Sequence, residues 1–350
     1  MTDFVHLTNK TEYSLSEGAL PITRIAELCQ SFSMPAVGIS DNNNMFGALE
    51  FSEQISKVGV QPILGCNIKV KTPKEYLHEN IEDKDLYFYL NIFSKSNEGY
   101  ENLLKCISNA YTLNKGDAYV RLDELIKLKE GLIILSGGNN SILTHSTGTM
   151  ITKQSKQFVS DFKREFNDNF YIEIQRLGIA DYRLNEEAVL NLAFDHQIPL
   201  VATNDAYFEG PEHFEAHDAL MCIEKKLFVS QADRTRLSKE HYFKTQNEML
   251  EQFHDLPEAL NNTIEIAQRC VHRPKIKNPI LPVYDDDQNK EKELLQKLAK
   301  DGLDDRLNAK FNIENIDIEQ QSEMRKVYEE RLFKELKIII NMKYEGYFLI

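Results

Sequence analysis

The sequence predicts an α/β protein, best fitted by a closed βα barrel, followed by a helical region. Short apolar runs alternate with amphipathic stretches from about residue 36 to residue 223, as they do in parallel α/β folds, open or closed. Polar residues follow several of the apolar runs, which is where βα barrels place their sites. The alternation stops after Cys270, so we expect a different architecture beyond it.

The apolar runs are short and rich in β-branched or aromatic residues, which predicts strands. We expect these strands over residues 36–40, 60–64, 86–93, 131–136, 170–174 and 199–203. The stretches between them have the apolar spacing of helices. We expect those helices over residues 46–58, 99–113, 152–166 and 182–196, with a further helix over 214–223.

The remainder of the chain predicts a linker and two helices. Residues 273–290 contain prolines and three consecutive aspartates without any regular period, so they are expected to connect residues 1–272 to residues 291–350. Both helices are amphipathic and need a surface to pack on. Their apolar positions are Leu294, Leu295, Leu298 and Leu307 in the first, and Met324, Val327, Leu332, Leu336 and Ile339 in the second. Residues 346–350 form an apolar run without a terminating signal, so we expect a truncated piece of a longer chain.

Composition excludes several classes of protein. The formal net charge of −14 disfavours a main DNA-binding surface, although it leaves room for a local basic patch. The five cysteines are scattered, without a CxxC pair, so neither a disulfide framework nor a zinc ribbon is predicted. The sequence has no signal peptide pattern and no apolar run approaching about 20 residues, so we expect a cytoplasmic protein without a membrane segment.

A metal site would need carboxylates and imidazoles that converge at the strand ends. The candidates are Glu17, Asp41, Asp205 and His217. Each has an ordinary alternative, because Asp41 could cap the following helix, Asp205 could cap a turn, and a lone helical histidine is more often packed. His6 lacks a second histidine two residues away, and the phosphate-loop, dinucleotide-binding, nucleophile-elbow and HExxH patterns do not occur.

Several short sequence motifs occur together, in an order and spacing that is typical of one protein family. They are Phe4-Val-His-Leu, Tyr13-Ser-Leu-Ser-Glu-Gly-Ala, Ile39-Ser-Asp, Pro62-Ile-Leu-Gly, Gly99-Tyr-Glu-Asn-Leu, Gly131-Leu-Ile-Ile-Leu-Ser-Gly-Gly, Val201-Ala-Thr-Asn-Asp and Ala216-His-Asp. Together they resemble the N-terminal PHP (polymerase and histidinol phosphatase) domain of bacterial DNA polymerase III alpha subunits, the C-family replicative polymerases. The resemblance implies a PHP-type distorted βα barrel in residues 1–272, followed by the mainly helical start of the polymerase palm and thumb region in residues 291–350.

The resemblance also implies that the metal site of this domain has been lost. The positions that hold ligands in family members with an intact site correspond here to Thr8, Lys10, Glu17, Asn42, Asn67, Tyr89, Gly138, Asp205 and Tyr207. Only two of these are carboxylates and none is a histidine. Because zinc or manganese needs three or more converging ligands, we expect no loaded cluster. Lys10 could instead pair with Glu17 or Asp205, so that a salt bridge replaces the charge of a metal.

For function, the resemblance implies a DNA-directed DNA polymerase that extends primed DNA with dNTPs by a two-metal mechanism. The catalytic aspartates of the palm would lie beyond Ile350, so residues 1–350 are expected to contain no catalytic residue and no cofactor, and to be inactive alone. Magnesium is expected for the complete polymerase. The implied role of this region is that of a scaffold that docks the proofreading exonuclease subunit, while the sliding clamp and other replisome subunits bind elsewhere.

Two other functions remain open at this point. The first is an active metal-dependent PHP phosphoesterase or exonuclease, which Thr8, Lys10, Asn42 and Asn67 count against because it requires the metal cluster. The second is a binding module with no polymerase attached. The sequence following Ile350 would distinguish this module from a polymerase subunit.

Overall fold

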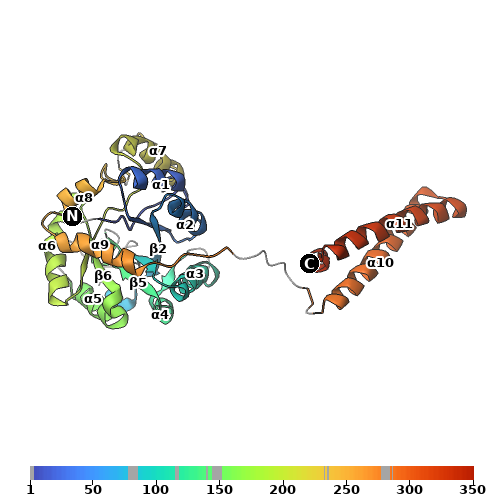
Figure 1. Cartoon of the computed structure of the whole chain (residues 1–350), viewed down its shortest axis with the longest axis horizontal. Coiled ribbons are helices and arrows are strands. Elements are labelled where there is room, and N and C mark those ends of the chain that lie inside the picture. Colours follow the sequence, from blue (N-terminus) through green and yellow to red (C-terminus); the bar gives the residue numbers. More distant parts are fainter. Residues whose placement is uncertain are drawn as a thin grey trace. The chain divides into compact units, whose positions relative to one another are not determined.

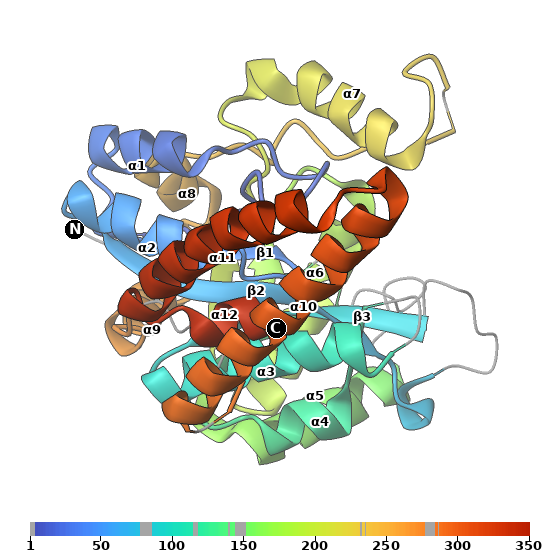
Figure 2. The same cartoon turned by 90° about the vertical axis from the view of Figure 1, so that its right-hand side faces the viewer.

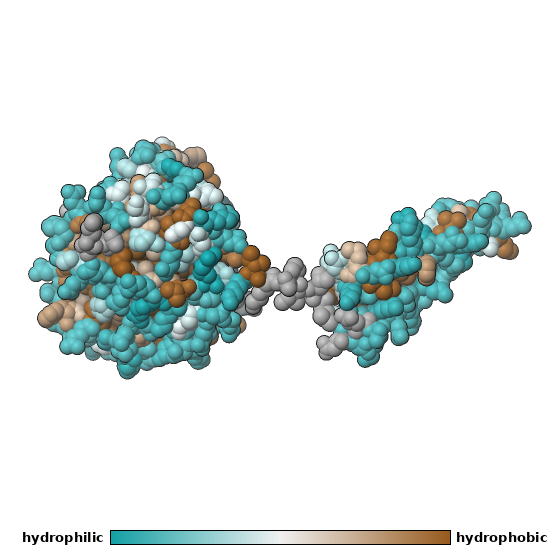
Figure 3. All heavy atoms as spheres, in the orientation of Figure 1, coloured by the Kyte–Doolittle hydropathy of each residue, from teal (hydrophilic) through white to brown (hydrophobic). Residues whose placement is uncertain are grey.

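A computed structural model describes residues 4–77, 86–114, 118–138, 141–143, 152–231, 233–234, 236–276, 284–285 and 287–350. The chain divides into two compact units, Met1–Pro274 and Lys275–Ile350 (Figure 1). Most of the face of the first unit shown in Figure 3 is hydrophilic, with apolar side chains in separate patches. None of the described helices is both long and apolar enough to cross a membrane.

The first unit is built on one curled sheet with the strand order β1-β2-β3-β5-β6-β7. These strands are β1 (Ala36–Asn42), β2 (Gln61–Lys71), β3 (Tyr87–Ser94), β5 (Leu132–Leu135), β6 (Phe170–Gln175) and β7 (Leu200–Thr203), and the two-residue strand β4 (Val120–Arg121) pairs with β2. Six of them lie where the sequence predicts strands. The neighbouring pairs β1–β2, β5–β6 and β6–β7 are parallel.

Alternating strands and helices are typical of parallel sheets, but β3 runs antiparallel to both of its neighbours, β2 and β5, so the sheet is mixed. A parallel neighbour requires a crossover, usually a helix, whereas antiparallel strands do not. Residues 72–86, between β2 and β3, contain the single-turn helix η1 (Lys74–Tyr76) among their described part. The sequence predicted no helix over this connection, and that gap was the signal for a reversal of direction.

The N-terminal segment closes the sheet into a barrel. On one side, the carbonyl oxygens of His6 and Asn9 accept hydrogen bonds from the backbone of β1, at 2.7 Å and 3.0 Å. On the other side, Lys10 N–H donates to Ala206 O at 2.9 Å, and Ala206 N–H donates to Thr8 O at 3.1 Å. Because Ala206 follows β7, the segment joins the two ends of the strand order, and the predicted barrel is confirmed.

The interior of the barrel changes from apolar to polar along the strands. One apolar cluster takes side chains from the N-terminal segment, from every strand of the main order and from helix α9 (Pro257–Arg269). Its members include Leu7, Ala36, Ile63, Phe93, Ile133, Tyr171, Val201 and Ile266. Since side chains alternate between the two faces of a strand, the next inward positions are two residues away. Those positions include Asn91, Glu173 and Thr203, and Asn67 lies two positions further along β2 on the same face; all four are polar and buried.

Helices cover the outside of the barrel (Figures 1 and 2). They are α1 (Ile22–Ser31), α2 (Ala48–Lys57), α3 (Asn97–Thr112), α4 (Leu122–Lys127), α5 (Lys153–Phe166), α6 (Ala180–Asp195), α7 (Phe214–Lys225) and α8 (Gln246–Gln252), with the short helices η4 (Asn167–Asn169) and η5 (Pro211–His213). Helices α1 and α2 pack through one apolar cluster that also contains β1 residues, and the inner faces of α3, α5 and α6 belong to a second. The predicted helices are all present, whereas α1, α4, α8 and α9 were not expected.

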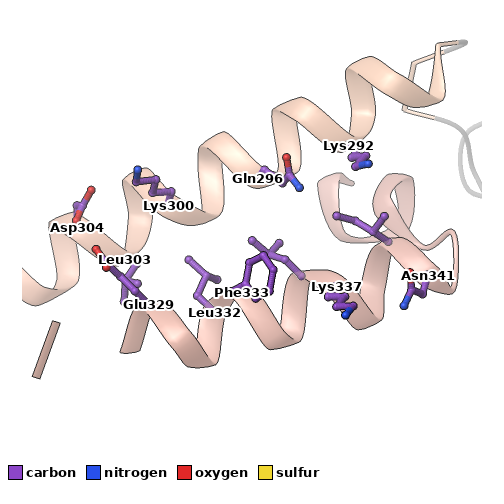
Figure 4. Close-up of a pocket in the computed structure, with 12 residues that line it drawn as sticks. Lys292, Gln296, Lys300, Leu303, Asp304, Glu329, Leu332, Phe333, Lys337 and Asn341 are labelled. Carbon is purple, nitrogen blue, oxygen red and sulfur yellow. The ribbon is translucent and has the colours of Figure 1, made fainter. Parts of the chain in front are cut away.

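The second unit is helical, as predicted, and consists of α10 (Gln288–Glu314), α11 (Ile318–Asn341) and α12 (Glu345–Leu349). Asp287 and Asp317 cap the first two helices by accepting backbone hydrogen bonds from Asn289 and Gln320. Helix α10 begins inside the predicted linker 273–290, of which residues 277–283 and 286 lie outside the described residues. Apolar side chains such as Leu303, Leu332 and Phe333 line a groove between α10 and α11 (Figure 4).

Candidate functional site at the mouth of the barrel

The topology of the barrel gathers the predicted site residues at one end, where the parallel strands finish. Thr8 and Lys10 belong to the closing N-terminal segment and Glu17 to the loop after it; the others lie on or directly after strands of the barrel. These others are Asn42 on β1, Asn67 on β2, Tyr89 on β3, Gly138 after β5, and Asp205 and Tyr207 after β7. Asn139, from the same turn as Gly138, lies outside the described residues.

Lys10 is buried and its ammonium group is held inside the barrel. Lys10 Nζ donates to the backbone oxygen of Ser40 at 2.5 Å and to its hydroxyl at 3.0 Å. It also lies 3.6 Å from Asp205 Oδ1, and the two side chains are only 1% and 13% exposed. The expected pairing of Lys10 with a retained carboxylate is therefore confirmed for Asp205. An ammonium group therefore supplies positive charge at a position where the family resemblance places a metal ligand.

Asp205 is positioned by its own backbone as well as by its side chain. It has a φ of 51°, in the left-handed region that non-glycine residues rarely adopt. Its N–H donates to Thr8 Oγ1 at 3.0 Å, and the next residue, Ala206, pairs with the same segment. Asp205 therefore does not act as the simple turn cap that its sequence context allowed. It fixes β7 to the closing segment.

Glu17 forms a separate group with Asn42, His217 and Tyr207. Asn42 Nδ2 donates to the Glu17 carboxylate, and His217 Nε2 donates to the Glu17 backbone oxygen at 2.6 Å. Tyr207 is buried beside them and hydrogen bonds with the Asn42 side chain. Burial, with Asp205 and Glu17 nearby, raises the pKa of Tyr207 well above its usual value, so the phenol stays neutral. His217 is buried and its ring holds the Glu17 loop in place. It therefore has the structural role that is usual for a lone histidine on a helix.

Asp41 does not cap the following helix, because α2 begins at Ala48 after Gly47. It accepts hydrogen bonds from the backbone and hydroxyl of Thr11, both at 2.7 Å, and from the Ser14 hydroxyl at 2.6 Å. Burial raises the pKa of Asp41, and these hydrogen bonds partly offset the effect. Asp41 therefore anchors the chain that leaves the closing segment.

A buried carboxylate that the sequence reasoning missed lies at the centre of the barrel. Glu173, on β6, accepts hydrogen bonds from Asn91 Nδ2 at 3.0 and 3.2 Å, from Gln175 Nε2 at 3.0 Å and from Thr203 Oγ1 at 2.5 Å. Gly137 N–H donates a further bond at 3.2 Å. Burial raises the pKa of Glu173, and hydrogen bonds from Thr203 and Asn91 oppose the shift.

This network extends across the barrel to a predicted site residue, since Asn67 Nδ2 donates to Asn91 Oδ1 at 2.9 Å. Gly138 provides room for the Gln175 side chain of this network. A Cβ atom at this position would lie 2.3 Å from Cδ of Gln175, and the φ of Gly138 is 52°. The missed signal was the spacing of Glu173 and Gln175 within an otherwise apolar strand. That alternation places both side chains on the inward face.

The donor set of the barrel mouth does not fit a zinc or manganese cluster. The Glu17 carboxylate is engaged by an amide, and the Asp205 carboxylate lies beside an ammonium group. Within the described part of the chain, no three His, Cys, Asp or Glu side chains come together to hold a metal. Such clusters need three or more nitrogen, sulfur or oxygen ligands with available lone pairs. The metal content of the protein stays a prediction, tested below.

His6, in the closing segment, is expected to make the fold sensitive to acid. Its ring lies between Phe4 and Phe243, and its Nε2–H donates to Lys244 O at 2.7 Å. Burial lowers the pKa of His6 to about 4. An unfolded histidine has a pKa of about 6.5, so between these values the unfolded chain binds a proton that the folded chain excludes. The free energy of unfolding should therefore fall by up to about 1.4 kcal/mol for each unit of acidification through this range.

Denaturant unfolding followed as a function of pH measures this effect. Burial also lowers the pKa of His241 to about 4, so the wild type should lose stability through both residues. In His6→Phe, which cannot titrate at this position, the loss should be shallower. A variant with the same pH slope as the wild type would show that His6 does not contribute. Asp41 and Glu173, whose pKa values are raised, act in the opposite direction in both proteins and cancel in the comparison.

Comparison with known proteins identifies relatives along the whole chain. Residues 6–177 match the PHP domain family, and residues 293–350 match the family described as the bacterial DNA polymerase III alpha NTPase domain. The chain is 38% identical to the DNA polymerase III subunit alpha of Caulobacter vibrioides and 33% identical to that of Escherichia coli, in each case over 99% of its own length. It spans 30% and 29% of the length of these relatives. A solved structure from Bifidobacterium adolescentis has a TM-score of 0.38 and 11% identity, covering 71% of this chain and 95% of its own, which is too distant to indicate an activity.

Proposed function

Because the chain belongs to the DNA polymerase III alpha subunit family, we propose that it forms part of a DNA-directed DNA polymerase that extends primed DNA with deoxynucleotides. Both family matches and the similarity along the chain support this proposal. Two-metal nucleotidyl transfer requires acidic residues that hold magnesium. We place those residues in the part of the relatives that this chain does not cover, and we expect a cytoplasmic enzyme.

We propose further that the barrel is a scaffold and docking domain without a reaction of its own. The observation that carries this proposal is the ion pair between Lys10 and Asp205, inside a mouth lined by amides and tyrosines. A PHP hydrolase would need metal ions there to polarise a phosphate and activate water. An ammonium group that already donates to Ser40 cannot bind and activate a water molecule as a metal ion does.

A domain that has a large core but no catalytic site of its own is suited to hold other proteins in place. We propose that the barrel supports the polymerase core and binds the proofreading exonuclease subunit. The nuclease activity of that subunit would make a nuclease site in this domain unnecessary. The sliding clamp, other replisome subunits and primed template would bind the complete polymerase through regions that these residues do not include.

The metal content and activity of the purified chain test the scaffold proposal. Elemental analysis should find less than one zinc or manganese per chain, and phosphatase and 3′-exonuclease assays should show no activity above a buffer control. The complete subunit, supplied with magnesium, should extend a primed template.

Two or three stoichiometric metals together with hydrolysis would instead support the metal-dependent phosphoesterase. The matched variants Glu17→Gln and Asp205→Asn identify the ligands in that case, since each would remove metal and activity together. Hydrolysis that survives both substitutions would indicate a contaminating nuclease.

A further inference from the structure

Past the buried amides of the barrel mouth, β2, β3 and β4 continue as a three-stranded extension with two different faces. One face belongs to a buried apolar cluster and consists of Ile68, Val70, Phe88, Leu90 and Val120. Side chains alternate along a strand, so the residues between these point the other way. Lys71 lies opposite Tyr87 on β3 and beside Arg121 on β4, so these three share the second face. We call Lys69, Lys71, Tyr87, Tyr119 and Arg121 the basic face.

The basic face combines cationic and aromatic side chains in direct contact. Lys69 Nζ lies 4.1 Å from the centre of the Tyr87 ring, and Lys71 Nζ lies 5.3 Å from the centre of the Tyr119 ring. The centres of the two rings are 5.4 Å apart. Lys71 and Arg121 are exposed, and both tyrosines are partly exposed. A ligand can therefore reach both the charges and the rings.

The charge of this face differs from that of the chain as a whole. Strands β2, β3 and β4 contain no aspartate or glutamate, although the chain has 55 of these residues and a net charge of −14. Arg121 pairs with the exposed Asp123 at 2.6 Å. An exposed ion pair contributes little free energy, so the guanidinium group can exchange this carboxylate for a phosphate, which it binds well. The basic face is therefore suited to a ligand with several phosphates.

The connection between β2 and β3 opposes such a ligand. Residues 78–85 carry four acidic residues and one lysine, and they lie outside the described residues. Negative charge near a phosphate backbone weakens its binding. We therefore expect a Kd of roughly 10⁻⁵ to 10⁻⁴ M at physiological salt, at the weak end of the range for non-specific binding to nucleic acids.

We propose that the basic face binds single-stranded DNA. Proteins that bind single strands without sequence preference combine cations that contact phosphates with aromatic rings on which bases stack. Base stacking on a ring is stronger than an exposed cation–π contact. A base can therefore replace a lysine over a tyrosine ring, while the ammonium group turns to a phosphate. In a duplex the base faces are already stacked on one another, so a single strand is preferred.

This contact is separate from the docking of partner proteins and from the binding of primed template by the rest of the polymerase. The choice of DNA over RNA rests on the proposed polymerase function. Primer extension by the complete subunit tests that function by itself, so the two can fail independently.

Fluorescence anisotropy with the complete 350-residue chain and a labelled oligothymidylate of about 12 nucleotides tests the inference. At about 50 mM salt, Lys71→Glu combined with Arg121→Glu should raise Kd at least about tenfold. It should also flatten the logarithmic salt dependence by about 1.4, since each phosphate contact of a single strand contributes about 0.7. Tyr119→Ala should raise Kd about fivefold or more, and Tyr119→Phe, which keeps the ring, should not.

The matched control is Lys57→Glu combined with Lys225→Glu. These two exposed lysines lie at the ends of α2 and α7, outside the basic face, and their reversal changes the net charge by the same amount. The control should leave Kd unchanged. Thermal melting checks that every variant is folded, so that a change in Kd reports on binding.

Weaker binding by the Lys71 and Arg121 variant, with the control unaffected, supports the basic face. Equal weakening by the control would show a long-range effect of net charge and would overturn the assignment. A blunt duplex of the same length that binds as tightly as the single strand would also overturn it, and so would Tyr119→Ala with unchanged Kd. Absence of binding by the wild type would overturn the inference while leaving the polymerase function untouched.

Discussion

Lys10→Ala is expected to lower the melting temperature of the chain by roughly 6 to 12 °C while leaving nucleotide incorporation by the complete subunit unchanged per folded molecule. Removing one member of a buried ion pair costs about 3 kcal/mol, because the remaining charge has lost its partner. In this variant the Asp205 carboxylate would lose its ammonium partner, and the Ser40 backbone oxygen would lose a donor at 2.5 Å. Calorimetry measures the first effect and primer extension the second.

Two further variants separate charge from packing in this prediction. Lys10→Met keeps most of the buried stem but removes the ammonium group, so it should also destabilise, though less than alanine. Combining it with Asp205→Asn should recover part of the loss, because the unpaired carboxylate is then gone. A Lys10→Ala subunit that melts normally but no longer incorporates nucleotides would show that the barrel mouth takes part in synthesis. The scaffold proposal would then be wrong.

Glu173→Leu is expected to lower the free energy of unfolding by about 3 kcal/mol or more, since it removes the shared acceptor of several buried donors. Asn91, Gln175 and Thr203 all donate to this carboxylate, and so does the backbone of Gly137. Glu173→Gln should cost about 1 to 3 kcal/mol, because its NH₂ group would face one of those donors. Urea unfolding near neutral pH measures both changes.

Glu187→Gln, on the exposed part of α6, is the matched control and should leave stability unchanged. The opposite result for Glu173→Gln is also informative. If that variant is as stable as the wild type or more stable, desolvation of the carboxylate outweighs its hydrogen bonds. Glu173 would then be protonated in the folded protein, and it would not be the fixed acceptor that its neighbours require.

Local patterns predicted the individual strands of this fold better than their arrangement. A run such as Leu132–Leu135 is apolar and short, and this alone identifies a strand. The direction of β3 depends on the connection from β2, and the lack of a helical period in that connection is its sign in the sequence. The closing segment was not predicted as a strand because it forms single bridges to β1 and to Ala206. Such bridges depend on where distant residues lie.

The candidate site was predicted in two ways, from the resemblance to a family and from the residues alone, and the first identified more of it. Its positions came from the resemblance to a family, and the structure places Lys10 beside Asp205 as that resemblance allowed. Polar side chains that directly follow strands are recognisable in the sequence as site candidates, whereas Glu173 lies within a strand and was missed. Its partners Asn91 and Thr203 come from two other strands. Only the folded barrel brings their side chains together.

Closing the barrel with the first residues of the chain has a consequence for its biosynthesis. The segment around Thr8 can pair with β1 soon after both leave the ribosome, but its other edge must wait for Ala206. At about 5 to 20 residues per second, that wait lasts roughly 10 to 40 s. During this time an unpaired strand edge stays open to other chains. The nascent protein therefore passes through a period in which this edge can pair with other chains before its own fold covers it.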